Sequence, residues 1–93
     1  MDRQKPQEAL RRIAKMRRWY EFKATLKCTR CPENHPATLQ FHHVGGKDAN
    51  LSEVAGVWSW KRLMAEVAKC IVLCANCHAK EHYEEKIRCV AQR

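Results

Sequence analysis

The first strong periodic signal in the chain is an amphipathic helix over residues 7–23. Its apolar positions recur at the spacing of a helix that turns about 100° per residue. They are Leu10, Ile13, Met16 and Tyr20. The basic residues on the opposite side of this helix are Arg11, Lys15 and Arg18. Arg17 interrupts the apolar sector, and Trp19 lies at its flank, where we expect it to pack under a sheet.

The middle of the chain predicts a short strand, a loop and a second helix. Residues 39–43 form the strand, which Gly45 and Gly46 close, and residues 44–58 form the loop. Ser59 is a typical N-cap for the helix that follows. The apolar positions of that helix follow i, i+3, i+4, i+7 spacing, and we expect them in the core. They are Trp60, Leu63, Met64 and Val67.

A second strand and a final helix complete the pattern. Residues 71–73 are an apolar run short enough for a buried strand. Asn76 is a typical N-cap, so we expect it to cap the last helix. The stripe that this helix is expected to bury consists of Ala79, Tyr83, Ile87 and Val90.

The chain has 93 residues, which is enough for one small domain. A chain of this length buries only about 60–65% of its unfolded surface, so a metal or disulfides commonly add stability. The start, from Met1 to Pro6, lacks the apolar segment of a secretory signal, and no apolar run is long enough to span a membrane. We therefore expect a cytoplasmic protein with no membrane partner. In that compartment thiols stay reduced, and paired cysteines bind metal.

Most of the positive charge lies near the start of the chain. The formal net charge is +8. Residues 1–30 contain ten Lys or Arg against three Asp or Glu, which gives +7 and leaves +1 for the other 63 residues. Charge concentrated in this way suits a polyanionic partner, although a solvated helix face has the same composition.

Four of the six cysteines form two CxxC pairs separated by 42 residues. The pairs are Cys28 with Cys31 and Cys74 with Cys77. Two such turns provide four thiolates for a tetrahedral zinc site, with bonds of about 2.3 Å and no open position for a substrate. We therefore predict a structural zinc ion; the alternative is four reduced cysteines in the core. Cys70 and Cys89 fit no CxxC turn and are predicted to be buried free thiols.

Four of the five histidines fall into two motifs. His78 and His82 are four residues apart in the predicted last helix, on one face and away from its apolar stripe. His42 and His43 are neighbours at the end of a strand, so their side chains diverge. Three imidazoles can then hold one divalent ion while the fourth takes a proton from water, as phosphodiester hydrolysis requires. His35 is expected at the surface, and a mixed zinc shell of cysteines with His78 and His82 ranks lower because it leaves cysteines without metal.

The segments that carry these residues resemble the HNH family of nucleases, whose ββα-metal core is also called the His-Me finger. They are LQFHH at residues 39–43 and IVLCANCHAKEH at residues 71–82. With the flanking cysteine pairs, the likeness covers about residues 28–83. By analogy, His42 is a metal ligand and His43 is the general base. The likeness also implies His78 as the second ligand and, from the colicin-type branch, His82 as the third.

One position departs from the family pattern. The family has a middle Asn ahead of the helix histidine, which braces the loop between the strands, whereas this chain has Lys69 there. Asn76 is the nearby alternative, although its predicted role is to cap the last helix. The sequence leaves the bracing role open between these two residues.

Together, the patterns and the resemblance predict one α+β domain over residues 1–93. A basic N-terminal helix (1–27) would precede a zinc-pinned ββα-metal core with a connecting helix (28–83), and the end of the C-terminal helix (84–93) would follow. The expected cofactors are a structural Zn²⁺ and one catalytic ion, which can be Mn²⁺, Co²⁺, Ni²⁺, Zn²⁺ or Mg²⁺.

The expected function is DNA endonuclease activity that nicks one strand as a monomer, while a double-strand cut needs a homodimer or two encounters. Arg11, Lys15 and Arg18 are expected to contact DNA phosphates. The alternative is a zinc-stabilised nucleic-acid-binding module without catalysis, which has no need of the histidine pair. Small proteins of this family are often phage or prophage products. We therefore expect the protein in the cytoplasm of a bacterium or a phage-infected host, with phage packaging proteins as possible partners.

Overall fold

A computed structural model describes residues 6–92 of the protein. Residues 1–5, which belong to the predicted basic segment, and Arg93, at the predicted end of the last helix, lie outside the described residues. The elements are, in order, α1 (Pro6–Lys23), β1 (Leu39–His43), α2 (Leu51–Val54), α3 (Trp60–Val67), β2 (Cys70–Cys74) and α4 (Ala75–Ala91). Within residues 6–92 the fold is therefore a small α+β structure with four helices and one two-stranded antiparallel sheet.

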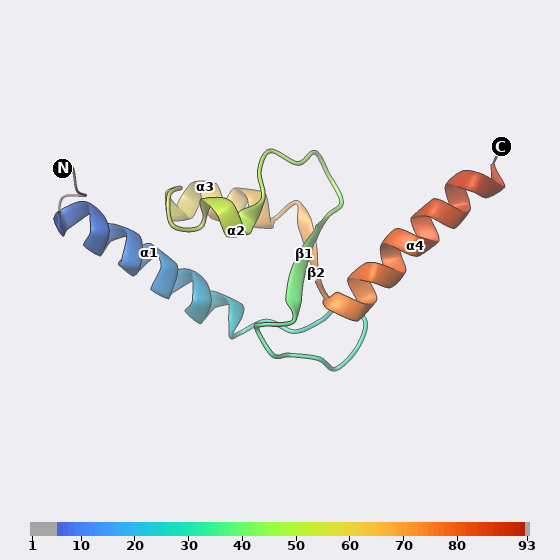
Figure 1. The fold of residues 1–93 in the computed structure, drawn as a ribbon, viewed down its shortest axis with the longest axis horizontal. Helices are drawn as coiled ribbons and strands as arrows, with labels where there is room; N and C mark the ends of the chain where they lie inside the picture. Colours follow the sequence, from blue (N-terminus) through green and yellow to red (C-terminus); the bar gives the residue numbers. More distant parts are fainter. Residues whose placement is uncertain (1–5, 93) are drawn as a thin grey trace, which may run out of the picture.

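The sheet occupies the middle of an elongated molecule that measures 55 × 30 × 26 Å. Helices α1, α2 and α3 lie toward one end, and α4 projects toward the other (Figure 1). The strands pair so that Leu39 lies opposite Cys74 and His43 lies opposite Cys70. The first strand has its predicted bounds, and the second is one residue longer at each end than its apolar run.

The two sides of β1 have different neighbours because alternate residues of a strand point to opposite faces. Gln40 and His42 contact residues of α4. Phe41 and His43 contact α1 and α3 instead. The predicted divergence of the two neighbouring histidines is therefore confirmed, and each reaches a different helix.

The larger buried cluster joins α1, α2 and α3. Its buried members are Trp19, Leu51, Ala55 and Leu63. The Trp19 ring centroid lies 5.3 Å from that of Phe41 and 5.8 Å from that of Phe22. An aromatic side chain buries about 150–250 Å², so these rings contribute much of the contact between α1 and the sheet. The prediction that Trp19 packs inside is confirmed.

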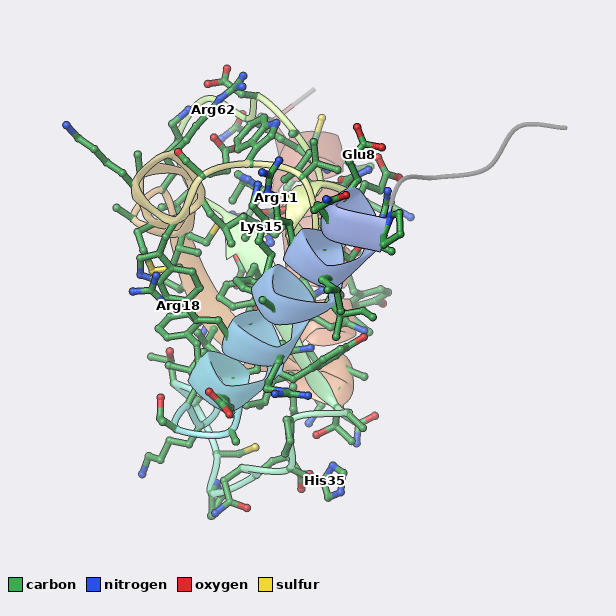
Figure 2. All side chains as sticks on the ribbon, turned by 90° about the vertical axis from the view of Figure 1, so that its left-hand side faces the viewer. Glu8, Arg11, Lys15, Arg18, His35 and Arg62 are labelled. Carbon is green, nitrogen blue, oxygen red and sulfur yellow. The ribbon has the colours of Figure 1, made fainter. Side chains whose placement is uncertain are left out.

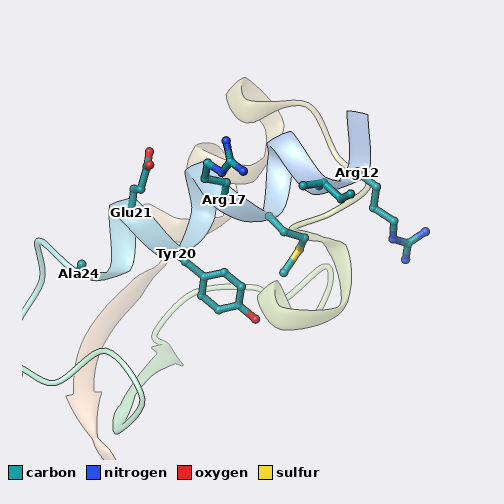
Figure 3. A pocket seen from close by; sticks show the side chains of 7 residues that line it. Arg12, Arg17, Tyr20, Glu21 and Ala24 are labelled. Atoms are coloured by element: carbon teal, nitrogen blue, oxygen red, sulfur yellow. The ribbon is translucent and has the colours of Figure 1, made fainter. Parts of the chain in front are cut away.

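The apolar sector of α1 remains largely uncovered, contrary to what an amphipathic pattern suggests. Leu10, Ile13 and Tyr20 are exposed, and Met16 is the member of the sector that packs against the core. An open groove of about 690 Å³ runs along this side of the helix (Figure 3). Trp19, at the flank, orients the helix because it is the largest apolar side chain there and is fully enclosed.

The basic side of α1 lies next to α3 (Figure 2). Lys15 Nζ donates a hydrogen bond to the carbonyl oxygen of Val57 at 2.8 Å. The Arg18 guanidinium lies 4.0 Å from the ring centroid of Trp60, which is a cation–π distance. Long basic side chains can cover apolar surface with their aliphatic stems, so the basic side of α1 can pack against α3 and the loop before it.

Helix α3 confirms its prediction, and α2 was missed. The backbone N–H of Arg62 donates to Ser59 Oγ at 3.2 Å, so Ser59 is the N-cap. Leu63 is buried, and the other three predicted positions pack partly buried against the same cluster. The predicted loop of residues 44–58 contains α2, whose Leu51 is buried. One helical turn is too short to give a periodic signal.

Helix α4 differs from its prediction in two ways. Its N-cap is Cys74, whose Sγ accepts a hydrogen bond from the N–H of Cys77 at 3.5 Å, and not Asn76. The stripe predicted to be buried is exposed, at Tyr83, Ile87 and Val90. The helix projects away from the sheet (Figure 1), so this stripe has no core to face. Among the described residues no helix has both the length and the apolar character that crossing a bilayer requires.

Candidate metal centres and a paired histidine

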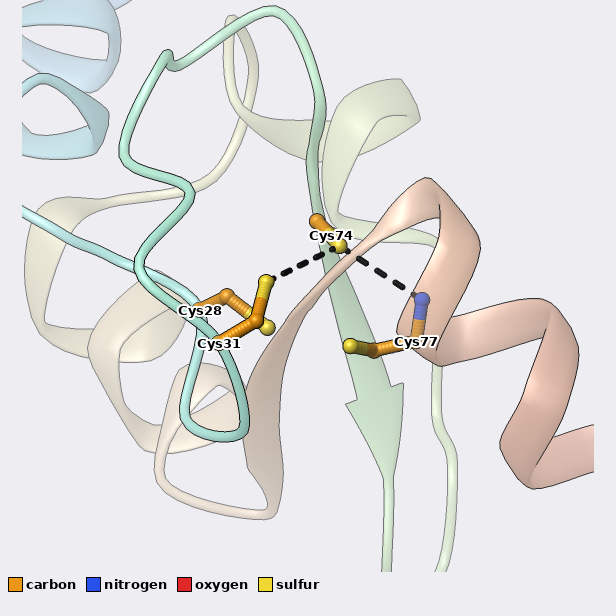
Figure 4. A group of neighbouring side chains, drawn as sticks. All are labelled: Cys28, Cys31, Cys74 and Cys77. Carbon is orange, nitrogen blue, oxygen red and sulfur yellow. Dashed lines mark hydrogen bonds between the residues drawn. The ribbon is translucent and has the colours of Figure 1, made fainter.

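Four cysteines from three segments meet at the junction of β2 and α4 (Figure 4). Cys28 and Cys31 come from the turn after α1, Cys74 ends β2, and Cys77 lies in the first turn of α4. One sulfur from each lies within 4.8 Å of the others. Two sulfurs bound to one tetrahedral zinc ion would be roughly 3.8 Å apart. The 3.6 Å between the Sγ atoms of Cys31 and Cys74 is close to that value, so this donor set fits a structural zinc ion.

The protonation of this cluster also suits a metal. Burial acts to raise the pKa of Cys28, but hydrogen bonds from the backbone of Cys74 and Arg30 outweigh it and lower the pKa to about 6. Burial and the neighbouring sulfurs raise the pKa of Cys77 to about 12. One thiolate is thus formed in advance, while the remaining protons leave when a metal binds.

The two remaining cysteines lie outside this cluster. Cys70, in β2, is half-buried, and its Sγ lies 3.5 Å from the carbonyl oxygen of Glu66, to which it donates. Cys89 is exposed on α4, so the prediction that both would be buried is wrong for Cys89. Cys89 is exposed because this part of α4 projects away from the sheet and has no core beside it.

Three of the predicted histidines converge between β1 and α4. His42 is 7% exposed, and its ring centroid lies 5.1 Å from those of both His78 and His82, which are themselves 4.6 Å apart, so the three rings form a triangle. One nitrogen of each ring lies within 4.8 Å of the others. The Nε2 atoms of His78 and His82 are 3.0 Å apart. Nitrogens bound to one tetrahedral ion would be about 3.3 Å apart, so the rings are close to that arrangement.

Polar contacts at the outer nitrogens orient these rings. Gln40 Oε1 lies 2.5 Å from His78 Nδ1 and accepts a hydrogen bond from its N–H. Glu85 Oε1 lies 3.2 Å from His82 Nδ1, and its other oxygen lies 3.3 Å from His42 Nε2. With protons at both Nδ1 atoms, the Nε2 lone pairs of His78 and His82 face each other. Two facing lone pairs repel unless a cation or a proton lies between them, so the pair is suited to bind a cation.

Burial lowers the pKa of His78, and the nearby charges of His82 and His42 lower it further. A neutral imidazole is the form that binds a metal. Gln40 and Glu85 were both missed from the sequence. Gln40 is two residues before His42 and Glu85 three residues after His82, so each shares a face with a predicted ligand. That spacing was the available signal.

An ion pair connects the two clusters. Arg30, in the first CxxC turn, lies 2.5 Å from Glu81 of α4, measured from Nη1 to Oε1. The hydrogen bond from Arg30 lowers the pKa of Glu81 and raises that of Arg30. Arg88 approaches the other Glu81 oxygen at 3.6 Å. Glu81 could also join His42 and Glu85 around a cation, although Arg30 already neutralises its charge.

His43 lies on the other side of β1 and is paired with a buried carboxylate. Its Nε2 is 2.9 Å from Oε2 of Glu66, a residue of α3 that is only 2% exposed. Glu66 also accepts hydrogen bonds from the N–H of Asp48 at 3.0 Å and from Lys69 Nζ at 3.1 Å. The Asp48 bond is the largest cause of a pKa near 2; burial opposes it, and Lys69 and His43 lower the pKa further.

The carboxylate therefore accepts a hydrogen bond from the Nε2–H of His43, which leaves the free lone pair of this ring at Nδ1. Sequence reasoning missed Glu66, because a glutamate inside an amphipathic helix is indistinguishable from a surface residue. Its burial appears only when α3 packs across the end of the sheet.

Lys69 ties the loop after β1 to the end of α3. Its Nζ lies 2.8 Å from Oδ2 of Asp48 in addition to its contact with Glu66. Its carbonyl oxygen accepts a hydrogen bond from the N–H of Val44 at 2.8 Å. Asn76 is exposed at the start of α4. Of the two residues left open by the sequence, Lys69 is the one that makes bracing contacts.

Comparison of the chain with protein-family models, with curated proteins and with solved structures found no match.

The remaining predicted site residues lie away from both clusters. Arg11, Lys15 and Arg18 are on α1, at the opposite end of the molecule from α4 (Figures 1 and 2). His35 is exposed in the loop before β1, as expected, and its Nδ1 accepts a hydrogen bond from the N–H of Ala37 at 3.0 Å.

Proposed function

We propose that the protein is a metal-dependent endonuclease of the HNH type, with a ββα-metal core made by β1, β2 and α4, that hydrolyses phosphodiester bonds in DNA. The observation that carries the proposal is the pair of facing Nε2 atoms on His78 and His82, with His42 beside them. A fourth histidine, His43, extends from the same strand as His42. The four-cysteine cluster supports a separate structural role for zinc.

In this proposal His42, His78 and His82 hold one divalent ion. When bound, the ion neutralises charge on the phosphate and on the leaving oxygen. Three imidazole ligands suit Mn²⁺, Co²⁺, Ni²⁺ or Zn²⁺, and water positions would also admit Mg²⁺. Gln40 and Glu85 orient the ligand rings, because Gln40 accepts a hydrogen bond from His78 Nδ1 and the Glu85 carboxylate lies next to His82 Nδ1.

His43 is the proposed general base. Since the Nε2–H of His43 donates its hydrogen bond to Glu66, Nδ1 takes the proton of the attacking water. The water oxygen bonds to phosphorus as the bond from phosphorus to the 3′-oxygen breaks, and that oxygen gains a proton from solvent. The products are a 5′-phosphate and a 3′-hydroxyl. Lys69 takes the bracing role of the family's middle Asn, since it holds the loop that follows His43.

The basic side of α1 is the proposed contact surface for DNA phosphates. Arg11 and Arg18 are exposed, and Arg62 of α3 is exposed beside them (Figure 2). Arg18 and Arg62 stack on tryptophan rings at 4.0 and 3.7 Å. Stacking leaves the guanidinium edge free to donate to a phosphate. Lys15 contributes charge here, although its ammonium already bonds to the protein.

The test is incubation of zinc-loaded protein with supercoiled plasmid and each of the five divalent ions. We expect nicked circles with at least one ion, and single-hit kinetics if a monomer cuts one strand. His43→Ala should reduce the rate by about 10²–10⁴-fold, the usual effect of losing a positioned base, without weakening ion binding. His35→Ala is the matched control and should cleave like the wild type.

The outcomes separate the candidates. DNA binding without nicking in any ion would favour the zinc-stabilised binding module. Nicking that survives in His43→Ala would leave a nuclease whose base is a different residue. Charge reversal of Arg11 and Arg18 should weaken DNA binding regardless of sequence and flatten its salt dependence. An unchanged salt slope would show that this side of α1 does not contact DNA.

A further inference from the structure

A cleft of about 380 Å³ opens beside His43, on the side of β1 away from α4. Its walls are the C-terminal end of α1, strand β1 and the segment from Lys47 to Ser52. The cleft falls within the 300–1,000 Å³ range that is usual for small-ligand sites, toward its lower end. This volume suits one nucleotide better than a folded partner.

The charge of this cleft favours an anion. Lys23 and Lys47 line it together with His43, and its lining includes no carboxylate among the described residues. Within residues 6–92, neither Lys23 nor Lys47 takes part in an ion pair. Lys69 and Lys15, by contrast, each have a bonded partner within the protein.

The remaining lining is mixed in a way that matches a nucleotide. Phe41 and Leu51 provide apolar surface, while Asn50 and Ser52 provide polar groups on the rim. Asn50 Nδ2 already donates to Glu53 at 3.2 Å, so its amide oxygen is the group left to accept from a ligand. A phosphate with an attached sugar and base combines the same two kinds of surface.

We propose that this cleft is a nucleotide subsite, in which Lys23 and Lys47 bind the phosphate next to the one that is cut. The inference rests on the proposed nuclease function, because His43 on the cleft wall is the proposed base. It adds a second set of phosphate contacts, distinct from the basic side of α1, and places the substrate strand along the open edge of β1.

The direct test measures binding of thymidine 3′,5′-bisphosphate to zinc-loaded protein by isothermal titration calorimetry. The double variant Lys23→Met/Lys47→Met should raise the Kd at least about tenfold, since it removes both charged hydrogen-bond donors that face the phosphate. Lys61→Met/Lys86→Met removes the same charge from exposed sites outside the cleft and should leave the Kd within about twofold. Unfolding temperature and zinc content establish that all variants are folded.

Two further arms identify what the cleft recognises. Inorganic phosphate should bind more weakly than the bisphosphate but with the same dependence on the lysines, whereas thymidine alone should show no such dependence. Ser52→Tyr, which fills the cleft without changing its charge, should also weaken bisphosphate binding. In plasmid cleavage, the cleft variants should raise KM and leave kcat within a few-fold.

Equal weakening in the two double variants, or no weakening in either, overturns the subsite. If the protein binds the bisphosphate through these lysines but nicks no DNA, the subsite stands and the nuclease proposal fails. If it nicks DNA and the cleft variants have unchanged KM, the nuclease proposal stands and the subsite fails.

Discussion

The cysteine and histidine clusters are neighbours at the start of α4, yet they differ in almost every physical respect. The cysteine cluster combines two buried residues with two half-buried ones, and its four sulfurs are enough for a complete tetrahedral set around one metal ion. The histidine cluster has three ligands, and one of them, His82, is exposed. A closed set of four ligands leaves an ion no position for a substrate, whereas three ligands at an open surface do.

The cysteine cluster can support the histidine cluster because both include residues of the first turns of α4. Cys77 and His78 are adjacent residues, so closing the sulfur set fixes the first turn of α4 and therefore the direction of His78. The Arg30–Glu81 ion pair holds the next turn to the same cysteine loop. We therefore expect the cysteine cluster to stabilise the fold and the histidine cluster to stay accessible to a substrate. The two expectations can be tested separately.

The largest expected effect is on the cysteine cluster. Structural zinc sites contribute about 10–16 kcal/mol of apparent binding free energy, against a usual total stability of about 5–15 kcal/mol. Cys31→Ser should therefore abolish cooperative unfolding and reduce bound zinc far below one ion per chain. Circular dichroism and elemental analysis are the measurements, with Cys89→Ser as the matched control. A folded, zinc-free Cys31→Ser protein would contradict the structural role.

The opposite result is expected at the histidine cluster. His78→Ala should keep the fold and the zinc ion but weaken binding of the second ion by more than about 100-fold, because losing even an outer partner typically weakens it 10–100-fold. Calorimetric titration with Mn²⁺ or Co²⁺ measures this directly. Loss of fold in His78→Ala would remove the distinction between the two clusters.

A smaller effect should follow from the residue behind His78. Gln40→Leu removes the acceptor of the Nδ1 proton, so the ring loses its fixed orientation, and ion affinity should fall about 10-fold or somewhat more. Gln40→Glu keeps an acceptor there and should bind the ion at least as well as the wild type. Equal affinities of the Leu variant and the wild type would show that the hydrogen bond does not orient the ligand.

A separate effect concerns Glu66, which is buried like the cysteines but has protein partners in place of a metal. Its pKa of about 2 lies below the usual value near 4.5, so its charge stabilises the fold above that usual value. This stability is lost as the pH falls from about 5 toward 2. Urea unfolding of the wild type and Glu66→Gln should differ at pH 7 and converge as the pH approaches 2.

The wild type and Glu66→Gln have the same cysteine cluster, so any loss of zinc at low pH should destabilise both proteins equally. A difference that stays constant from pH 7 to pH 3 would show that the Glu66 charge does not contribute to stability.

Local patterns predicted several elements because their causes lie within a few residues. The strand over residues 39–43 and the Ser59 cap of α3 were predicted with their observed positions. The same patterns failed where burial depends on distant contacts. The apolar sector of α1 and the stripe of α4 are periodic, but of the α1 sector only Met16 meets the core, and no core faces the stripe of α4. Asn76 was a plausible cap, but a cysteine one residue before the helix took that place.

The residue types that can form the sites are visible in the sequence: two CxxC pairs, two neighbouring histidines on a strand, and two more at helical spacing. Their partners depend on how the elements pack, which brings His42 to His78 and His82 and turns His43 to Glu66. Packing also lets Lys69 tie Asp48 to Glu66. The physical reason is that spacing fixes the direction of a side chain relative to its own element, whereas its partner depends on how separate elements pack. Glu66 carries no signal of its own, and the spacing of Gln40 and Glu85 shows only the face that each shares with a predicted ligand. Packing is what brings Glu66 and Gln40 within hydrogen-bond distance of His43 and His78.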